Sequence, residues 1–185
     1  IHCKDILRVV QKPKRRLKVV IDPVGSCGGE IATLLLKKLG CTFEAIHLEE
    51  TPVFPRPPEP TAGALKKLAD AVKKYRADIG FAFDPDADRL SLVDENGRAI
   101  GEEYTLPLAV LSSAKEGGTV VANLSTSMLT QSAAEIKKCK FVRSEVGEAN
   151  VVAEMLKRKS SIGGEGNGGV IDARLYSFGR DALSG

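Results

Sequence analysis

The order of predicted strands and helices occurs twice along the chain, and this repeat constrains the fold more than any other feature. Apolar runs indicate buried strands, and apolar residues at helical spacing indicate amphipathic helices. The first half has strand 17–22, helix 30–39, strand 41–46, helix 61–75 and strand 77–83. The second half has strand 119–122, helix 128–137, strand 140–142, helix 150–157 and strand 161–163. The two halves are therefore predicted to be structural siblings.

Strands that alternate with helices are typical of layered α/β domains. At 185 residues, 43% of them hydrophobic, the chain has room for one large domain or two small ones, and the repeat favours two. We predict an α/β fold of two tandem three-layer αβα domains with similar topology and mixed sheets. The first spans residues 1–102, and the second spans residues 103–185 and is truncated at its C-terminus. Ligands in such domains bind beyond the carboxyl ends of the strands.

Composition argues against several classes of function. The net charge of +3 is mild, and six Phe, three Tyr and no Trp offer little for base stacking, so no nucleic-acid partner is indicated. No apolar run approaches a membrane span and no signal peptide is recognisable, so we expect no membrane partner and a cytoplasmic location. The four cysteines form no C-x-x-C pair, which favours reduced thiols.

The two ends of the sequence predict a longer parent protein. The chain has no initiating Met and opens within an apparent helix. A new helix is expected to begin within residues 179–185. We therefore expect that the sequence is a fragment.

Three aspartates lie at every second position directly after the strand 77–83, namely Asp84, Asp86 and Asp88. Arg89 follows them at once. Like charges this close repel one another, so an ordered loop that carries them normally needs a compensating cation. Hard oxygen ligands of this kind suit Mg²⁺, Ca²⁺ or Mn²⁺. Arg89 adds a fixed positive charge that is suited to a phosphate oxygen.

Two other interpretations of this loop remain open. With Glu95, the aspartates fall at positions one, three, five and twelve of a calcium-binding EF-hand loop, but Arg89 occupies position six, which requires glycine. The flanks also look like strands, whereas an EF-hand has a helix on each side. The second alternative is a solvated acidic turn without any ion, because Asp and Pro are common in turns.

A second polar loop occupies the equivalent position in the second half. Residues 164–169 read GEGNGG, so that Glu165 and Asn167 stand among glycines. Glycines let the backbone approach a ligand closely, while the carboxylate and the amide can form hydrogen bonds with adjacent hydroxyls. This combination suits a sugar, although a flexible glycine turn with two solvated polar residues would have the same composition.

Other residues carry weaker indications. Glu148 lies at a predicted helix start, where it complements the helix dipole or joins a ligand site. The loop 22–29 is neither G-x-G-x-x-G nor a Walker A sequence, so we interpret it as structural. His2 and His47 have no partner pattern and are predicted to be surface residues.

Four motifs in order resemble the α-D-phosphohexomutases, the superfamily of phosphoglucomutase, phosphomannomutase and phosphoglucosamine mutase. They are residues 54–60 (FPRPPEP), 84–89 (DPDADR), 146–151 (VGEANV) and 164–169 (GEGNGG). The resemblance covers nearly the whole chain and corresponds to the second and third of the family's four domains. It implies an isomerase of carbohydrate metabolism, which moves phosphate between the 1- and 6-positions of a hexose or hexosamine through a phosphoserine and a bisphosphorylated sugar.

The resemblance also implies a role for each loop. The three aspartates match the metal loop, which binds Mg²⁺ together with a phosphate oxygen of the phosphoserine. Arg89 is implied as the catalytic residue that faces the reaction centre. Glu165 and Asn167 match the sugar loop, which holds two hydroxyls of the hexose in either of two orientations. Glu148 completes the candidate substrate-binding residues.

Two departures from the family pattern limit these implications. Family members specific for glucose or mannose often carry serine at the position of Asn167 and histidine at that of Gly169, so the preferred sugar stays open. The serine loop and the main phosphate-binding loop belong to the family's first and fourth domains, the expected partners of this chain. We therefore expect the chain alone to be inactive. The alternative function is a non-catalytic metal-binding or sugar-phosphate-binding module.

Overall fold

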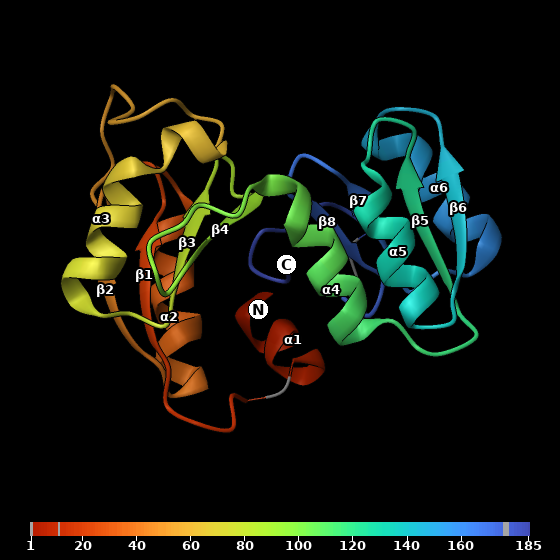
Figure 1. Ribbon diagram of the computed structural model, residues 1–185, viewed down its shortest axis with the longest axis horizontal. Helices are drawn as coiled ribbons and strands as arrows, with labels where there is room; N and C mark the ends of the chain where they lie inside the picture. Colours follow the sequence, from red (N-terminus) through yellow and green to blue (C-terminus); the bar gives the residue numbers. More distant parts are fainter. Residues whose placement is uncertain (1, 11, 176–177) are drawn as a thin grey trace.

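The computed structural model describes residues 2–10, 12–175 and 178–185, which form two similar lobes (Figure 1). A sheet lies at the centre of each lobe, with helices against both of its faces. The strands of the first lobe are β1 (Lys18–Asp22), β2 (Thr42–Ala45), β3 (Ile79–Phe83) and β4 (Leu90–Asp94). Those of the second lobe are β5 (Thr119–Asn123), β6 (Lys140–Ser144), β7 (Ile162–Glu165) and β8 (Gly169–Asp172).

The two sheets have the same topology. The strand order is β2-β1-β3-β4 in the first lobe and β6-β5-β7-β8 in the second. In each sheet the first three strands in this order are parallel, and the last strand is antiparallel to its neighbour. The predicted fold class, two tandem αβα domains with mixed sheets and similar topology, is confirmed. The same topology places the β3–β4 loop and the β7–β8 loop at equivalent positions.

The helices pack on both sheet faces because successive strand residues point to opposite sides. The helices are α1 (His2–Val9), α2 (Gly28–Leu39), α3 (Lys66–Tyr75), α4 (Thr105–Ser113), α5 (Met128–Ile136) and α6 (Glu148–Arg158), with short 3₁₀ helices η1 (Ala62–Ala64) and η2 (Glu102–Tyr104). On β1, Val19 and Ile21 share a cluster with Leu36 of α2. Val20, between them, shares a cluster with Leu68 of α3. The first lobe therefore has a separate core on each side of its sheet.

The second lobe follows the same rule around β5. Val120 packs with residues of α4 and α5, including Leu106 and Ala133. Val121 points to the other face and packs with Val151 and Met155 of α6. Each lobe is thus built by the alternation of its central strand.

Three local predictions differ from the structure. Helix α4 was not predicted, because its sequence TLPLAVLSS is too uniformly apolar to show an amphipathic pattern. The predicted helix 61–75 is divided into η1 and α3, and the Thr61 side chain makes no cap hydrogen bond. Residues 182–184 form a turn where we expected a helix to begin.

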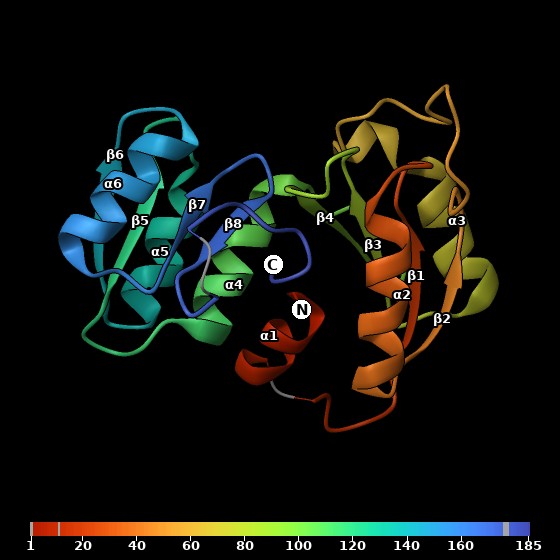
Figure 2. The same cartoon turned by 180° about the vertical axis from the view of Figure 1, so that it is seen from behind.

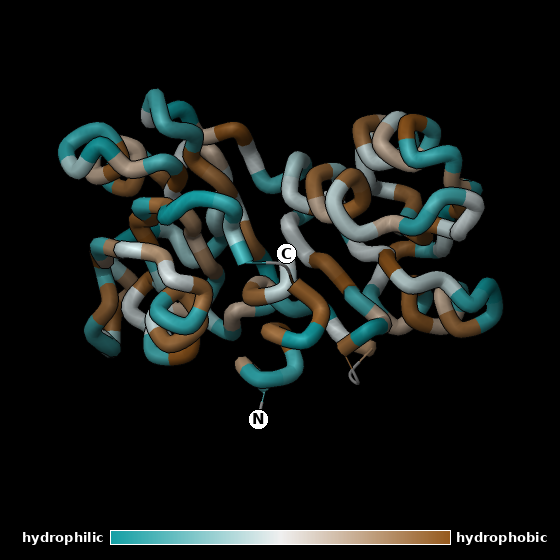
Figure 3. Tube along the Cα trace, turned by 90° about the horizontal axis from the view of Figure 1, so that it is seen from below, coloured by the Kyte–Doolittle hydropathy of each residue, from teal (hydrophilic) through white to brown (hydrophobic). Residues whose placement is uncertain are grey.

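Both chain ends lie between the lobes, as the two opposite views show (Figures 1 and 2). Cys3 and Ile6 of α1 pack with Leu35 of α2, and Leu175 joins the same cluster. A view from below shows apolar segments inside each lobe and in the terminal segments between them (Figure 3). None of the helices in the described ranges combines the length and the apolar character needed to cross a membrane.

Candidate functional site

The three predicted metal-binding aspartates come together at the carboxyl end of β3. One carboxylate oxygen each from Asp84, Asp86 and Asp88 lies within 4.8 Å of the others. Asp84 orders the loop, because its Oδ1 accepts hydrogen bonds from the backbone N–H groups of Asp88 and Arg89, both at 3.0 Å. Ala87 has a left-handed conformation, with φ of 56°, within this turn. Three carboxylate oxygens at this spacing can ligate one divalent cation.

The charges of this loop, which we call the metal loop (residues 84–89), are only partly balanced. Asp84 is buried, with 4% of its surface exposed. Burial, followed by the neighbouring carboxylates of Asp88 and Asp86, raises the pKa of Asp84 to about 7. Within the described ranges, Asp88 Oδ1 is buried and has no hydrogen-bond partner. A buried acceptor beside two more carboxylates fits a bound cation, so these residues are suited to Mg²⁺.

Arg89, the last residue of the metal loop, connects this loop to the proline-rich segment 52–60. Its Nη1 donates a hydrogen bond to Glu59 Oε1 at 3.3 Å. Its Nε lies 3.5 Å from Asp84 Oδ2 and 3.6 Å from Asp88 Oδ1, and it lacks a hydrogen-bond partner among the described residues. The implied catalytic arginine thus adjoins the candidate metal ligands and retains a donor for a further anion.

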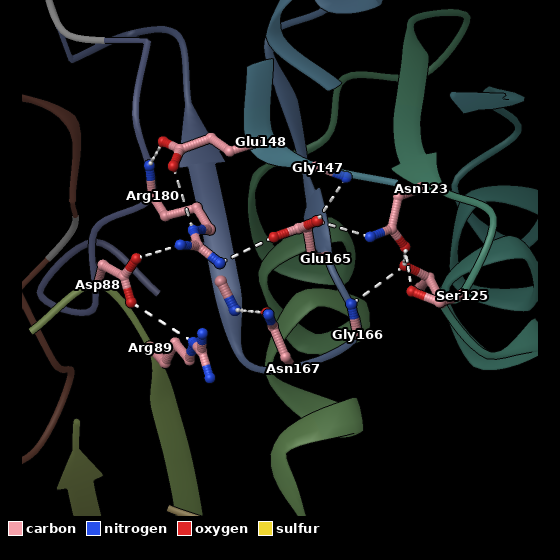
Figure 4. A network of polar contacts seen from close by, with 12 residues as sticks. Asp88, Arg89, Asn123, Ser125, Gly147, Glu148, Glu165, Gly166, Asn167 and Arg180 are labelled. Carbon is pink, nitrogen blue, oxygen red and sulfur yellow. Dashed lines mark hydrogen bonds and ion pairs between the residues drawn. The ribbon is translucent and has the colours of Figure 1, made fainter. Parts of the chain in front are cut away.

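The second predicted loop, which we call the sugar loop (residues 164–169), connects β7 to β8. Glu165 is buried, with 6% exposure, and its Oε1 accepts hydrogen bonds from Asn123 Nδ2 at 2.6 Å and from Gly147 N–H at 3.3 Å. Asn167 Oδ1 accepts a hydrogen bond from Gly169 N–H at 3.2 Å. The Glu165 carboxylate is therefore held in one orientation by groups at the end of β5 and at the N-terminus of α6 (Figure 4).

The metal loop and the sugar loop lie next to each other. Leu90, the residue directly after the metal loop, donates its N–H to Gly168 O in the sugar loop at 3.0 Å. Ala182 of the C-terminal segment donates its N–H to Ala87 O in the metal loop at 3.1 Å. Gly168 has φ of +94°, and a Cβ at this position would lie 2.5 Å from Leu90 O. Glycine is required for both reasons. The two loops, predicted only to be equivalent, are in fact neighbours in one site.

Arg180 is a residue of this site that the sequence patterns did not reveal. Its Nη2 lies 2.5 Å from Asp88 Oδ2, and its Nη1 donates to Glu165 Oε2 at 2.8 Å (Figure 4). Its backbone N–H donates to Glu148 Oε1 at 2.8 Å. Glu148, predicted to bind substrate, is therefore engaged with Arg180. The only signal in the sequence was the excess of carboxylates in the two loops, which required a cation from elsewhere.

A second buried ion pair fixes the proline-rich segment to the end of β1. Arg56 Nε donates to Asp22 Oδ2 at 2.9 Å. His47 Nδ1 lies 3.0 Å from Asp22 Oδ1, and the His47 side chain is only 14% exposed. The prediction of His47 as a surface residue without a partner is wrong, because the buried Asp22 carboxylate recruits both basic groups. His2 is partly exposed but also has a partner, since its Nε2 lies 3.1 Å from Asp181 Oδ2.

The fold and the site define a class of two-lobed α/β protein, in which a carboxylate-rich loop of one lobe meets a glycine-rich loop of the other. Sequence models for two domains of one family match nearly the whole chain. The model of phosphoglucomutase/phosphomannomutase α/β/α domain II matches residues 2–97, and that of domain III matches residues 102–184. The chain belongs to the phosphoglucomutase/phosphomannomutase family, as its motifs predicted.

Individual relatives agree with this assignment. The chain is 38% identical over 161 residues to a phosphoglucomutase/phosphomannomutase of Thermococcus kodakarensis, a match that covers 85% of this chain and 35% of the relative. It is 35% identical over 175 residues to a phosphoglucosamine mutase of Cupriavidus taiwanensis, with 91% and 38% covered. A crystal structure of a phosphoglucomutase/phosphomannomutase family protein from Burkholderia thailandensis superimposes with a TM-score of 0.88 at 26% identity and covers 98% of this chain and 40% of that one. The chain thus spans well under half the length of these proteins.

Proposed function

We propose that the chain supplies the metal-binding and sugar-binding parts of an α-D-phosphohexomutase active site. The enzyme interconverts the 1-phosphate and the 6-phosphate of a hexose or hexosamine through a phosphoserine and a bisphosphorylated sugar. The observation that carries the proposal is the hydrogen bond from Leu90, directly after the metal loop, to Gly168 of the sugar loop, which brings a candidate cation site and a candidate hydroxyl-binding site together in one place. Membership of the family supports the reaction type.

Each polar group then has a chemical task. Asp84, Asp86 and Asp88 hold Mg²⁺, which when bound would stabilise negative charge on the transferring phosphoryl group. Arg89 places a second positive charge beside these carboxylates, at 3.5 Å from Asp84 Oδ2. Glu165 accepts hydrogen bonds from sugar hydroxyls, because its carboxylate is fixed and faces the metal loop through Arg180. The chain also contributes to catalysis by holding the sugar in position between the two loops.

The substrate class follows from the sugar loop and from the relatives. Glu165 and Asn167 supply an acceptor and a mixed donor and acceptor, which suit two adjacent hydroxyls of a hexose ring. Relatives named phosphoglucosamine mutase and phosphoglucomutase/phosphomannomutase both match the chain, so the proposal includes hexosamine and hexose phosphates. We place the enzyme in the cytoplasm, where such phosphosugars are substrates of metabolism.

The division of labour between the lobes is also part of the proposal. The first domain, residues 1–102, carries the metal loop, and the second, residues 103–185, carries the sugar loop. The limits of the two family matches, 2–97 and 102–184, support a boundary near residue 102. The phosphoserine and the main phosphate-binding loop of the family belong to its first and fourth domains, so turnover requires those domains as well.

The test is a coupled assay on the full product of the gene that encodes the chain. The substrates are the 1-phosphates of glucose, mannose, glucosamine and N-acetylglucosamine, each with Mg²⁺ and with EDTA. We expect Mg²⁺-dependent formation of at least one 6-phosphate, and strong loss of activity in the Glu165→Gln variant. Glu154→Gln is the matched control, because Glu154 pairs with Arg158 within α6. If the full-length protein converts none of the four sugar 1-phosphates, the proposed function is refuted.

A further inference from the structure

Arg180 connects the two lobes through three carboxylates. The guanidinium lies 2.5 Å from Asp88 Oδ2 in the metal loop and 2.8 Å from Glu165 Oε2 in the sugar loop. Its Nε lies 3.4 Å from Glu148 Oε2 at the start of α6. The Arg180 side chain is only 15% exposed. One cation is therefore shared between a candidate metal ligand and a candidate sugar ligand (Figure 4).

The surroundings are built to hold Arg180 in this place. Its backbone N–H donates to Glu148 Oε1, and the next N–H, that of Asp181, donates to Val170 O at 3.0 Å. Gly169 lies under the side chain, because a Cβ at this position would clash with Arg180 Cδ. The stem of Arg180 thus crosses the sugar loop only because residue 169 is glycine. The main chain and the side chain are both fixed.

The arrangement still leaves polar atoms unsatisfied. In the part of the chain that the structure describes, Asp88 Oδ1 and Arg180 Nε are buried and have no hydrogen-bond partner. Buried polar atoms without a hydrogen-bond partner are rare in folded proteins. Asp88 therefore has one oxygen bound to Arg180 and a second oxygen, 3.6 Å from Arg89 Nε, that has no hydrogen bond and can accept a further cation.

We propose that Arg180 is a positioning residue, which competes with a divalent cation for Asp88 and couples the metal loop to the sugar loop. When a cation binds the three aspartates, Asp88 no longer needs the guanidinium, which then pairs fully with Glu165 and Glu148. Metal binding thereby changes the ion pairing of the sugar-binding carboxylate. Because coupling of this kind is reciprocal, a ligand that binds Glu165 also changes the affinity for the metal. The inference rests on the proposed function of the two loops.

The experiment is an amide NMR titration of the 185-residue protein with Mg²⁺ alone. The amide of Ala87 reports binding in the metal loop. The amide of Gly147 reports Glu165, because its N–H donates to Glu165 Oε1 at 3.3 Å. In the unmodified protein we expect both signals to shift with one dissociation constant, although Gly147 belongs to the other lobe.

The Arg180→Met variant removes the guanidinium that competes with Mg²⁺ for Asp88, and with it the connection between Asp88 and Glu165. We expect Mg²⁺ to bind about 5-fold or more tightly, within the usual range of such couplings, and the Gly147 response to disappear. Arg180→Lys keeps the charge but cannot reach both carboxylates at once, so it should lose the Gly147 response with a smaller change in affinity. Arg174→Met is the matched control for charge, because Arg174 pairs with Asp172 instead, and it should behave as the unmodified protein.

Several results would overturn the inference. One is an Arg180→Met affinity within about 2-fold of the unmodified protein, well below the usual range of such couplings, and another is a Gly147 response that persists in that variant. If Arg180→Met does not give the NMR spectrum of a folded protein, Gly169→Ala is the second test, because it displaces the Arg180 side chain and retains its charge. An unchanged Gly147 response in Gly169→Ala would refute the coupling. Failure of the metal-binding part of the proposed function looks different, because the Ala87 amide of the unmodified protein would then not respond to Mg²⁺ at all.

Discussion

Replacement of Asp84 by asparagine is expected to stabilise the metal-free protein, although it removes a buried charge at the centre of the site. Burial and the carboxylates of Asp88 and Asp86 raise the pKa of Asp84 to about 7. Because the pKa of Asp84 is higher in the folded protein than its unfolded value of 3.8, the contribution of Asp84 to the free energy of unfolding is fully present below pH 3.8. This contribution is lost as the pH rises to about 7. At pH 8 the ionised Asp84 therefore opposes folding.

The magnitude follows from the size of that change. About three pKa units at about 1.4 kcal/mol each correspond to about 4 kcal/mol at pH 8, which is an upper bound because the loop can relax. The amide oxygen of the introduced asparagine can still accept both backbone hydrogen bonds that Asp84 Oδ1 accepts. The ion pair with Arg89, at 3.5 Å, is lost and offsets about 1 kcal/mol. We expect a net stabilisation of about 1–3 kcal/mol at pH 8.

The assay is urea unfolding in EDTA at several pH values between 4 and 8. The advantage of Asp84→Asn should be near zero at pH 4, where Asp84 is protonated in the folded protein, and should increase up to about pH 7. With Mg²⁺ at pH 8 the order should reverse, because only the unmodified protein gains binding energy.

Asp94→Asn is the matched control for this variant. Asp94 Oδ1 also accepts two backbone N–H groups, from Asn96 at 3.0 Å and Arg98 at 2.7 Å, but outside the aspartate cluster. The Asp94→Asn variant should therefore show no stabilisation over the unmodified protein at pH 8. If Asp84→Asn destabilises the metal-free protein at pH 8 by about 1 kcal/mol or more, Asp84 is a satisfied ion-pair partner and the reasoning fails.

Three further predictions concern stability and the contact between the loops. Arg56→Met should destabilise the protein by about 3–5 kcal/mol in urea unfolding, because it leaves Asp22 as a buried charge with less compensation; a loss below about 1 kcal/mol would contradict this role. The Arg15 ion pair lowers the pKa of Asp78, so its stabilisation is present above pH 3.8 and is lost at lower pH; melting temperatures of Asp78→Asn and the unmodified protein should differ at pH 7 and converge toward pH 2, and a constant difference would refute the assignment. Gly168→Ala should cost about 1–3 kcal/mol, because it combines a φ of +94° with a clash between the loops; urea unfolding within about 0.5 kcal/mol of the unmodified protein would show that the loops separate easily.

The repeat in the sequence was sufficient to predict the fold because each half has strands and helices of clear periodicity. One exception is the short strand β8, which was not predicted. Another is α4, whose residues Leu106 and Val110 are buried while Leu108 and Leu111 are partly exposed and equally apolar. A helix with leucines on both its buried and its exposed sides has no amphipathic signal. Its position beside α5, on the same face of the second sheet, became visible only from the packing.

The candidate site could be predicted as far as its residues are close in sequence. The metal loop and the sugar loop are each a few residues long, so their composition carries the chemistry. Arg180 meets Asp88 from the other lobe, and Arg56 meets Asp22 across 34 residues of chain. Such pairs depend on how the elements pack, and a single sequence contains no periodic signal for them. The same holds for His47, whose partner is that buried aspartate.

A crystal structure of the protein with Mn²⁺ and a hexose 1,6-bisphosphate would show whether the metal loop and the sugar loop form one active site. We expect an anomalous peak for Mn²⁺ among Asp84, Asp86 and Asp88, and sugar hydroxyls on Glu165 and Asn167 in the same molecule. An anomalous peak elsewhere, or a sugar bound away from the sugar loop, would contradict the claim that the two loops form one active site.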